Sequence, residues 1–219
     1  MSTIAIIGGT GPQGKGLGYR FAKGGHDIIL GSRDAGRASA AAEELAAERP
    51  TDGAITGADN AGAAGAADVV LLAVPWNGHD ELVAELAPAL AGKVVISCVN
   101  PLGFDKRGPY GLDLGPTSAA EHAQELLPDS KVVGAFHHLS AVTLASDADF
   151  LDHEDVMICG DDSDAKAVVI ELSSTITGKS GIDAGALRLA RQLEPLTAVL
   201  ISINKKYKAH SGVAVVGLP

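Results

Sequence analysis

The stretch that most constrains the fold of this chain lies close to its N-terminus. A short apolar run, Ile4–Ile7, leads directly into a glycine-rich loop, and a segment compatible with a helix follows. Gly9, Gly11 and Gly14 give the spacing G-x-G-x-x-G, which is typical of the first strand–turn–helix unit of dinucleotide-binding folds. In that unit Gly9 permits the tight turn, Gly11 lets the backbone approach the pyrophosphate, and Gly14 allows helix and strand to pack closely. The phosphates would lie at the helix N-terminus, where free N–H groups favour negative charge.

A flexible glycine loop is the alternative interpretation of this motif, because the chain contains 27 glycines. The context favours nucleotide binding instead. The motif follows a strand-like run, opens a helix, and has a second predicted strand at the distance that a dinucleotide-binding unit requires.

The end of the second predicted strand, 26–31, indicates which dinucleotide is bound. An NAD enzyme places an acidic residue about 20 residues past the glycine loop, where it binds the ribose 2′-hydroxyl. This chain has Ser32 and Arg33 there instead. Ser32 can donate a hydrogen bond to a 2′-phosphate, Arg33 can make a charge-assisted contact with it, and Arg37 can face the same group. Asp34 could neutralise Arg33, and Arg33 could also lie at a solvated helix start, but the pattern favours NADP over NAD.

Strand and helix signals alternate along the chain and predict an α/β protein. We expect a Rossmann-type doubly wound fold with a mainly parallel sheet and a small C-terminal helical extension. Residues 1–155 would form the NADP-binding domain, and residues 156–219 a small segment that completes the substrate pocket and the dimer interface. The expected strands cover 3–8, 26–31, 53–56, 67–74, 93–99, 131–136 and 156–160; the expected helices cover 13–23, 38–49, 58–67, 79–90, a helix starting at the Ser118 capping box, one capped within 161–163 and ending near 177, and 186–206.

Residues that follow the central strands are candidates for ligand contact, because loops at the carboxyl ends of parallel strands line the ligand crevice. Val74, Pro75 and Trp76 end the continuous apolar run 67–74 and should lie near the cofactor. Trp76 is the only tryptophan. It could pack beside a flat ring or cap the core.

Asn100 and Pro101 follow strand 93–99 on the same side of the predicted sheet. Residues 101–116 then form the longest irregular stretch of the chain, rich in glycine and proline. A loop of this length in a compact domain is usually functional, so it could be a lid or part of a substrate pocket. A surface excursion is the alternative.

Two adjacent histidines, His137 and His138, follow strand 131–136 on the ligand side. Neighbours on a strand point to opposite faces, and no third ligand stands at a usable spacing, so no metal site is predicted. A histidine here could satisfy a buried backbone group or hydrogen-bond a carbonyl of a bound ring. The chain has no nucleophile elbow, Walker lysine motif or zinc-ligand spacing.

Composition limits the partners. The net charge of −10 argues against nucleic acid. No apolar stretch reaches the ~18 residues that span a bilayer, and no basic leader precedes the first strand, so we expect a cytoplasmic protein without a membrane partner. Cys98 and Cys159 lie in apolar runs and are expected to be reduced core residues. Helix 186–206 is apolar on more than one face, which predicts docking on the main domain and on a second subunit of a homodimer.

Taken together, these motifs resemble the NADPH-dependent reductases of the deazaflavin coenzyme F420. The resemblance runs in order along nearly the whole chain. Its N-terminal half rests on Ile6–Gly11, Gly14–Gly16, Gly31–Arg33 and Val74–Trp76, and its C-terminal half on Ala135–His137, Cys159–Asp162, Asp183–Gly185, Leu187, Arg191, Glu194, Leu196 and Thr197. The stretch 101–116 departs from the archaeal form of the family by being longer and richer in glycine and proline.

The resemblance implies a reversible hydride transfer between C4 of the nicotinamide of NADP(H) and C5 of the deazaflavin of coenzyme F420. It implies that Thr10 helps to bind the 2′-phosphate, that Ala141 lies by the nicotinamide carboxamide, and that His137 hydrogen-bonds the pyrimidine side of the deazaflavin. Both rings carry the reacting carbons, so the protein need only stack them and exclude water, and we assign His137 to orientation and charge stabilisation. The predicted cofactor-binding residues are Gly9, Thr10, Gly11, Pro12, Gln13, Gly14, Ser32, Arg33, Arg37, Val74, Pro75, Trp76, Asn100 and Ala141; the predicted substrate-binding residues are His137, Leu139 and Pro101.

Two other functions remain open from the residues. The chain could be an NADP-dependent reductase of another acceptor, such as an imine, a flavin or ferric iron. It could also be a non-catalytic NADP-sensing protein, although it carries no recognisable DNA-binding or partner module.

Overall fold

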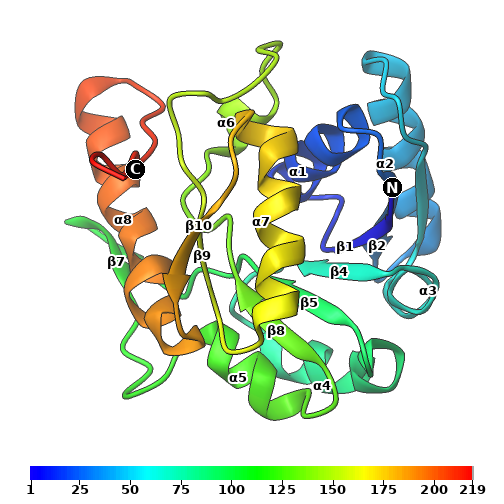
Figure 1. Cartoon of the computed structure of the whole chain (residues 1–219), viewed down its shortest axis with the longest axis horizontal. Coiled ribbons are helices and arrows are strands. Elements are labelled where there is room, and N and C mark those ends of the chain that lie inside the picture. The colour runs from blue at the N-terminus through cyan, green and yellow to red at the C-terminus, as the bar shows by residue number, and fades with distance from the viewer. Residues whose placement is uncertain (219) are drawn as a thin grey trace.

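The computed structural model describes residues 1–218 and consists of one large sheet with helices on both faces (Figure 1). Eight strands form this sheet in the order β10-β9-β8-β5-β4-β1-β2-β3. Neighbours from β3 to β8 are parallel, β9 is antiparallel to β8, and β10 is parallel to β9. The strands are β1 (Thr3–Ile7), β2 (Asp27–Ser32), β3 (Ile55–Asp59), β4 (Val69–Leu72), β5 (Val94–Ser97), β8 (Lys131–Gly134), β9 (Met157–Gly160) and β10 (Ile182–Gly185).

The predicted fold class is therefore confirmed. The helices are α1 (Pro12–Lys23), α2 (Ala35–Glu48), α3 (Asn60–Ala66), α4 (His79–Leu90), α5 (Ala119–Leu126), α6 (Ala141–Leu144), α7 (Ser163–Thr177) and α8 (Ala190–Tyr207), the last preceded by a 3₁₀ turn at Leu187–Leu189. In residues 1–218, no helix has both the length and the hydropathy to cross a membrane.

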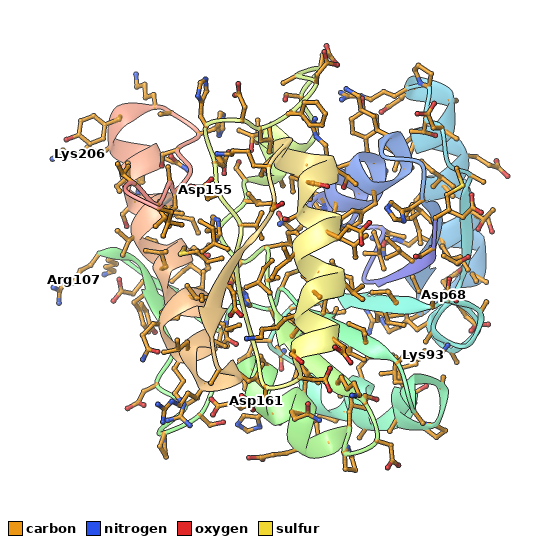
Figure 2. The ribbon with its side chains drawn as sticks, in the orientation of Figure 1. Asp68, Lys93, Arg107, Asp155, Asp161 and Lys206 are labelled. Carbon is orange, nitrogen blue, oxygen red and sulfur yellow. The ribbon has the colours of Figure 1, made fainter. Side chains whose placement is uncertain are left out.

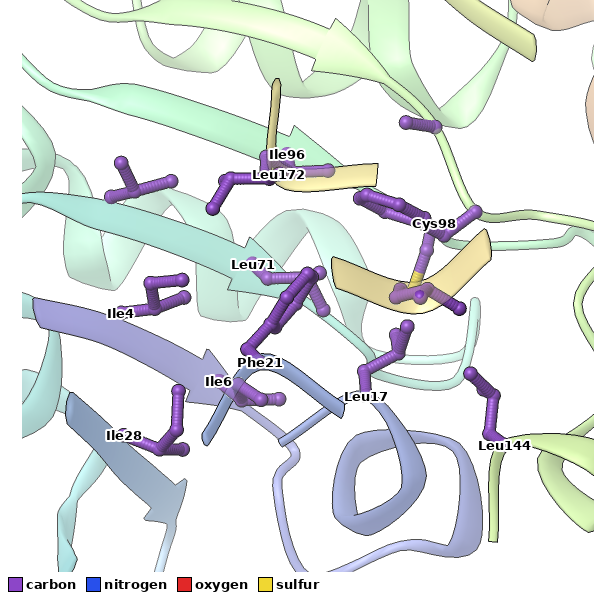
Figure 3. Packing of buried hydrophobic residues seen from close by; sticks show 14 of the residues in the cluster. Ile4, Ile6, Leu17, Phe21, Ile28, Leu71, Ile96, Cys98, Leu144 and Leu172 are labelled. Carbon is purple, nitrogen blue, oxygen red and sulfur yellow. The ribbon is translucent and has the colours of Figure 1, made fainter. Parts of the chain in front are cut away.

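The central strands are buried on both faces, as a continuous apolar run predicts. Alternate residues of β1 enter opposite cores: Ile4 and Ile6 join one buried cluster, and Ala5 and Ile7 the other. The first cluster also holds side chains of α1 and α7, including Leu17, Phe21 and Leu172 (Figure 3); the second holds residues of α3, α4 and α5, including Ala63, Val83, Leu86 and Ala119.

The glycine loop after β1 has the close packing that its sequence predicts, with one difference in roles. The positive φ of the turn falls on Gly8, at 79°, one residue before Gly9. Gly9 is instead packed against both β1 and β2, since a Cβ there would lie 2.7 Å from the Ile6 carbonyl oxygen and 3.0 Å from the Leu30 Cα. A Cβ on Gly14 would lie 2.7 Å from the Cα of Gly9, so Gly14 does allow helix and strand to approach.

The stretch 101–116, which was predicted to be irregular, contains a β-hairpin. β6 (Leu102–Asp105) and β7 (Gly108–Gly111) pair antiparallel around a turn at Lys106 and Arg107. Gly108, with a φ of 121°, lets the chain reverse. The hairpin escaped prediction because its strands have only four residues each and lack an apolar alternation.

The C-terminal segment adds to the same sheet rather than standing apart. β9 pairs with β8 and β10 with β9, while α7 crosses the front of the sheet in Figure 1. α8 packs against the hairpin, where a Cβ on Gly111 would lie 2.7 Å from the Cβ of Pro195. The short helix α6 was not predicted, and most other boundaries differ from those expected by one to three residues.

Candidate functional site

A crevice of about 980 Å³ lies at the carboxyl ends of the parallel strands. Most predicted site residues line it, although they come from the ends of five different strands and from the helices α1 and α2. Those lining the crevice are Thr10, Gly11, Pro12, Gln13, Gly14, Ser32, Arg33, Arg37, Val74, Pro75, Asn100, His137 and Leu139. The fold thus brings together residues that are more than a hundred positions apart in the chain.

One end of the crevice is lined by the N-terminus of α1 and by two arginines. The N-cap of α1 is Gly11, which offers no side-chain cap to the first turn, and Pro12 follows at the start of the helix. The N-terminal end of this helix therefore faces the crevice with its dipole and free N–H groups. This geometry suits the pyrophosphate of a dinucleotide.

Two arginines stand at the same end, beyond β2. Arg33 and Arg37 are exposed side chains that line the crevice beside Ser32. Asp34 does not neutralise Arg33 in the described part of the chain; its carboxylate caps α2 by accepting a hydrogen bond from the Arg37 backbone N–H at 2.9 Å. Both guanidinium groups are thus available to a phosphate.

Four predicted residues are not among those that line the crevice. Gly9 lies beneath the loop, where its N–H donates to the carbonyls of Ile6 and Gly31. Pro101 is buried next to Asn100, and Ala141 is the first residue of α6, two positions after Leu139.

Trp76 is the fourth, and its ring packs against protein side chains. Its centroid lies 5.2 Å from that of His79 and 5.5 Å from that of His122. Asp80 contacts both histidines, with its carboxylate oxygens 2.7 and 3.4 Å from their Nδ1 atoms. These contacts favour the core-capping interpretation of Trp76 and tie the loop after β4 to α5.

The inner end of the crevice is formed by His137 and Asn100. His137 is 2% exposed, and neither of its ring nitrogens makes a hydrogen bond of normal geometry within residues 1–218, although the Val99 backbone lies close to the ring. The Oδ1 atom of Asn100 is also buried without a partner there. Unpaired polar atoms in a buried site are costly, so their presence together marks a place that a polar ligand can satisfy.

The backbone of His137 is held from two directions. Its carbonyl oxygen accepts hydrogen bonds from Asn100 Nδ2 at 2.8 Å and from Thr197 Oγ1 of α8 at 2.7 Å. The preceding residue, Phe136, has a φ of 62°, a left-handed conformation that is strained in a residue with a bulky side chain. The Phe136 ring is packed edge-on against Phe21, 5.7 Å between centroids, which helps to hold that conformation.

Burial controls the chemistry of the ionisable groups here. Loss of hydration, with the neighbouring His138, lowers the pKa of His137 to about 3. His137 is therefore neutral near pH 7 and can donate or accept a hydrogen bond, but it holds no proton to transfer as an imidazolium. Burial also raises the pKa of the Cys98 thiol to about 12, and its Sγ donates to the Leu72 carbonyl, so this crevice-lining cysteine is no nucleophile.

His138 has a structural role. Its Nε2 donates to the Asp155 carbonyl at 2.6 Å. Among residues 1–218, no group of three or more histidine, cysteine, aspartate or glutamate side chains is placed to hold a metal ion.

Several crevice residues were not predicted from the sequence. Asp59 and Asn60 lie where β3 ends and α3 begins, beside Ser32 in the sheet. Residues at the carboxyl ends of parallel strands line the crevice, so a predicted strand that ended at residue 59 instead of 56 would have identified both. Thr197 was named only among the residues that carry the family resemblance, and its place in the middle of a helix gave no sign of a role in the crevice. The other unpredicted lining residues are Gly8, Ala61, Ala73, Asn77, Gly78, Glu81, Leu82, Glu85 and Cys98.

Comparison with known proteins places the chain among nucleotide-dependent reductases. Residues 3–101 match the family model described as "NADP oxidoreductase coenzyme F420-dependent". A protein of Methanocaldococcus jannaschii named F420-dependent NADP reductase is 40% identical, with 98% of each chain covered, and one of the same name from Methanothermobacter thermautotrophicus is 37% identical over 99% of this chain and 95% of its own. A crystal structure from Arthrobacter sp. FB24, provisionally named an F420-dependent NADP-reductase, superposes with a TM-score of 0.81 at 26% identity, covering 98% of this chain and 100% of the other.

Proposed function

The chain belongs to the family of F420-dependent NADP reductases, and from this we propose that it transfers a hydride reversibly between NADP(H) and the deazaflavin of coenzyme F420 within the crevice. The proposal rests mainly on one observation: the two ends of the same crevice carry different sets of binding groups. One end offers a helix N-terminus and two arginines, and the other offers a buried neutral histidine beside an unpaired amide oxygen. We also propose the cytoplasm as its compartment, since the free thiols of Cys98 and Cys159 fit a reducing environment.

In this proposal, NADP(H) lies along the crevice, with its phosphates at the end formed by α1 and the arginines and its nicotinamide toward the inner end. The loop Gly9–Gly14 holds the pyrophosphate, and Ser32, Arg33 and Arg37 hold the 2′-phosphate, with Thr10 nearby. Val74 and Pro75 extend along the nucleotide, while Trp76 keeps that loop in place through its packing on His79. Asn100 and Ala141 lie at the nicotinamide end.

The second ring lies over the inner end of the crevice. The nicotinamide and the deazaflavin supply the two carbons between which the hydride moves, so no protein group forms a bond to it. His137 hydrogen-bonds the deazaflavin as a neutral imidazole and stabilises the charge that develops on its pyrimidine side. Leu139 lies beside the ring and reduces the access of water, while the buried Pro101 packs behind Asn100 and does not touch the ring.

A direct assay tests this function. Oxidised coenzyme F420 mixed with NADPH and the protein should lose its visible absorbance as the deazaflavin is reduced. No bleaching at high protein concentration would contradict the proposal. Turnover only with an imine, a flavin or ferric iron would make the chain a reductase of another acceptor, and tight NADPH binding without turnover on any acceptor would favour the sensing function.

We further propose that the protein is a homodimer, with α8 at the interface. Val199, Ile203 and Tyr207 are four residues apart on α8 and so share one face of the helix, and Val199 and Tyr207 are 54% and 68% exposed. Phe104 on the adjacent hairpin is 67% exposed. Arg107 points outward from the hairpin tip on the same side of the molecule as Lys206 (Figure 2). A second copy would cover this apolar face.

Replacing Val199 and Ile203 together with aspartate should convert the dimer into a monomer, because two carboxylates would be buried without partners. Multi-angle light scattering at micromolar concentration measures the change. Val168→Asp, on the exposed face of α7, is the control and should leave the mass unchanged. A wild-type monomer under these conditions would refute the dimer.

A further inference from the structure

Arg20, in the second half of α1, has a guanidinium group that is completely buried. Its hydrogen bonds all end on one short segment, residues 143–149. Nε donates to the Leu144 carbonyl at 2.9 Å, and Nη1 donates to the carbonyls of Ala148 and Asp149 at 2.6 and 3.2 Å. Nη2 donates to the Thr143 and Ser146 carbonyls and to the Ser146 hydroxyl, at 3.1, 3.2 and 3.2 Å.

This arrangement uses the whole donor set of the side chain. A guanidinium has five N–H groups in a rigid plane, and each of its three nitrogens here meets at least one carbonyl of the segment. Within residues 1–218, it forms no ion pair with a carboxylate. The Asp149 carboxylate contacts Lys23 at the surface instead. A buried charge is stable only when it is well hydrogen-bonded, so the segment must keep this shape for Arg20 to remain inside.

The segment held by Arg20 continues directly from the inner end of the crevice. His137 and Leu139 line the crevice, and α6 and residues 145–149 follow within the same stretch of chain. Near the other end of α1, Gln13 Nε2 donates to the Leu139 carbonyl at 3.2 Å. Between these two contacts, a Cβ on Gly16 would lie 2.8 Å from the Cβ of Leu144, so the helices α1 and α6 touch closely.

The helix that faces the dinucleotide phosphates is thus tied along its length to the segment that faces the second ring. Hydride transfer is very sensitive to geometry, and a displacement of about 1 Å can lower a rate by about 100-fold. A link between the two halves of the site therefore bears directly on the reaction.

We infer that Arg20 is a positioning residue, which sets the segment Leu139–Asp149 against α1 and so holds the substrate side of the crevice at the right distance from the dinucleotide side. The inference rests on the proposed function. It concerns a residue outside the crevice that contacts neither ring.

Arg20→Met removes every one of these hydrogen bonds while keeping a long side chain. The hydride-transfer rate in single turnovers, normalised to active sites titrated with NADPH, should fall roughly 10- to 100-fold. The Kd for NADPH should stay within about twofold, because α1 and its N-terminal loop remain. Amide hydrogen exchange should become faster over residues 141–149, and the primary isotope effect with C4-deuterated NADPH should change. Arg20→Lys keeps a charge but only three donors, so its hydride-transfer rate should lie between those of the wild-type protein and Arg20→Met.

A second variant moves the same segment without touching Arg20. Gly16→Ala pushes Leu144 away from α1, so it should reproduce the slower hydride transfer with unchanged NADPH affinity. This variant decides the question if Arg20→Met does not fold. Lys23→Gln is the matched control, since it breaks only the exposed ion pair with Asp149 and should leave the rate per site unchanged.

The outcomes separate the inference from the proposed function. Faster exchange over 141–149 with an unchanged rate per site and isotope effect would overturn the inference and make Arg20 purely structural. An unchanged rate per site in Gly16→Ala would also count against it. A wild-type protein that binds NADPH but never reduces the deazaflavin would instead refute the proposed function.

Discussion

Replacing Arg33 with alanine should raise the KM for NADPH by about 10- to 100-fold while lowering kcat by less than about twofold. A charge-assisted hydrogen bond contributes about 1.5–3 kcal/mol, and the 2′-phosphate is remote from the reacting carbon. Such a contact is equally strong in the ground state and the transition state, so its loss appears in KM. Steady-state kinetics with NADPH and NADH measure the effect, and the preference for NADPH should fall by a similar factor.

Arg188→Ala is the matched control for this experiment. Arg188 is another exposed arginine, but it lies before α8 and does not line the crevice, so its loss should leave both KM values unchanged. If Arg33→Ala left the preference for NADPH over NADH intact, the assignment of Arg33 to the 2′-phosphate would be wrong.

Replacing His137 with alanine should lower the turnover of the deazaflavin by about 100-fold and leave the Kd for NADPH within about twofold. Removing one hydrogen-bond donor aimed at developing charge in a buried site costs about 100- to 1,000-fold in rate. In the proposed binding mode, the NADPH phosphates lie at the opposite end of the crevice, away from this side chain. Single-turnover absorbance measurements give the first quantity, and a fluorescence titration with NADPH gives the second.

The pH profile of the wild-type protein offers a second test of the same residue. Because its pKa is lowered to about 3, His137 remains neutral from pH 5 to pH 9, and its ionisation should not appear in the profile of kcat. His137→Gln, which keeps an amide donor, should restore part of the lost rate. A loss of NADPH affinity equal to the loss of turnover would show that His137 is a structural histidine.

Local pattern was sufficient to predict much of this protein. The strand before the glycine loop was predicted from Ile4–Ile7, and the helix His79–Leu90 was predicted with both ends correct. The short apolar run followed by glycines favours a buried strand, and the length of the segment 79–90 favours a helix. The hairpin in 101–116 was missed because its strands are short and gain stability from packing against α8, which is far away in the sequence.

Local pattern along the chain also predicted part of the candidate site. Arg33, Asn100 and His137 were predicted because each lies within three residues of a strand end, and the ends of parallel strands converge. Trp76 also follows a strand, yet its ring turns toward His79 and His122. The direction of a side chain in a loop depends on the neighbours that pack against it, and no spacing along the chain encodes those.

The sequence by itself determined the Rossmann-type sheet, the dinucleotide loop and the preference for a 2′-phosphate, since glycine spacing, apolar runs and the residues at strand ends act over short distances along the chain. Only the tertiary structure decided how the two halves of the site are joined. Thr197 reaches the His137 carbonyl across 60 residues, and Arg20 reaches the segment around Leu144 across 124. Such contacts depend on how the helices pack on the sheet. Buried polar groups without hydrogen-bond partners are costly, so the stable packing is one in which these groups are paired.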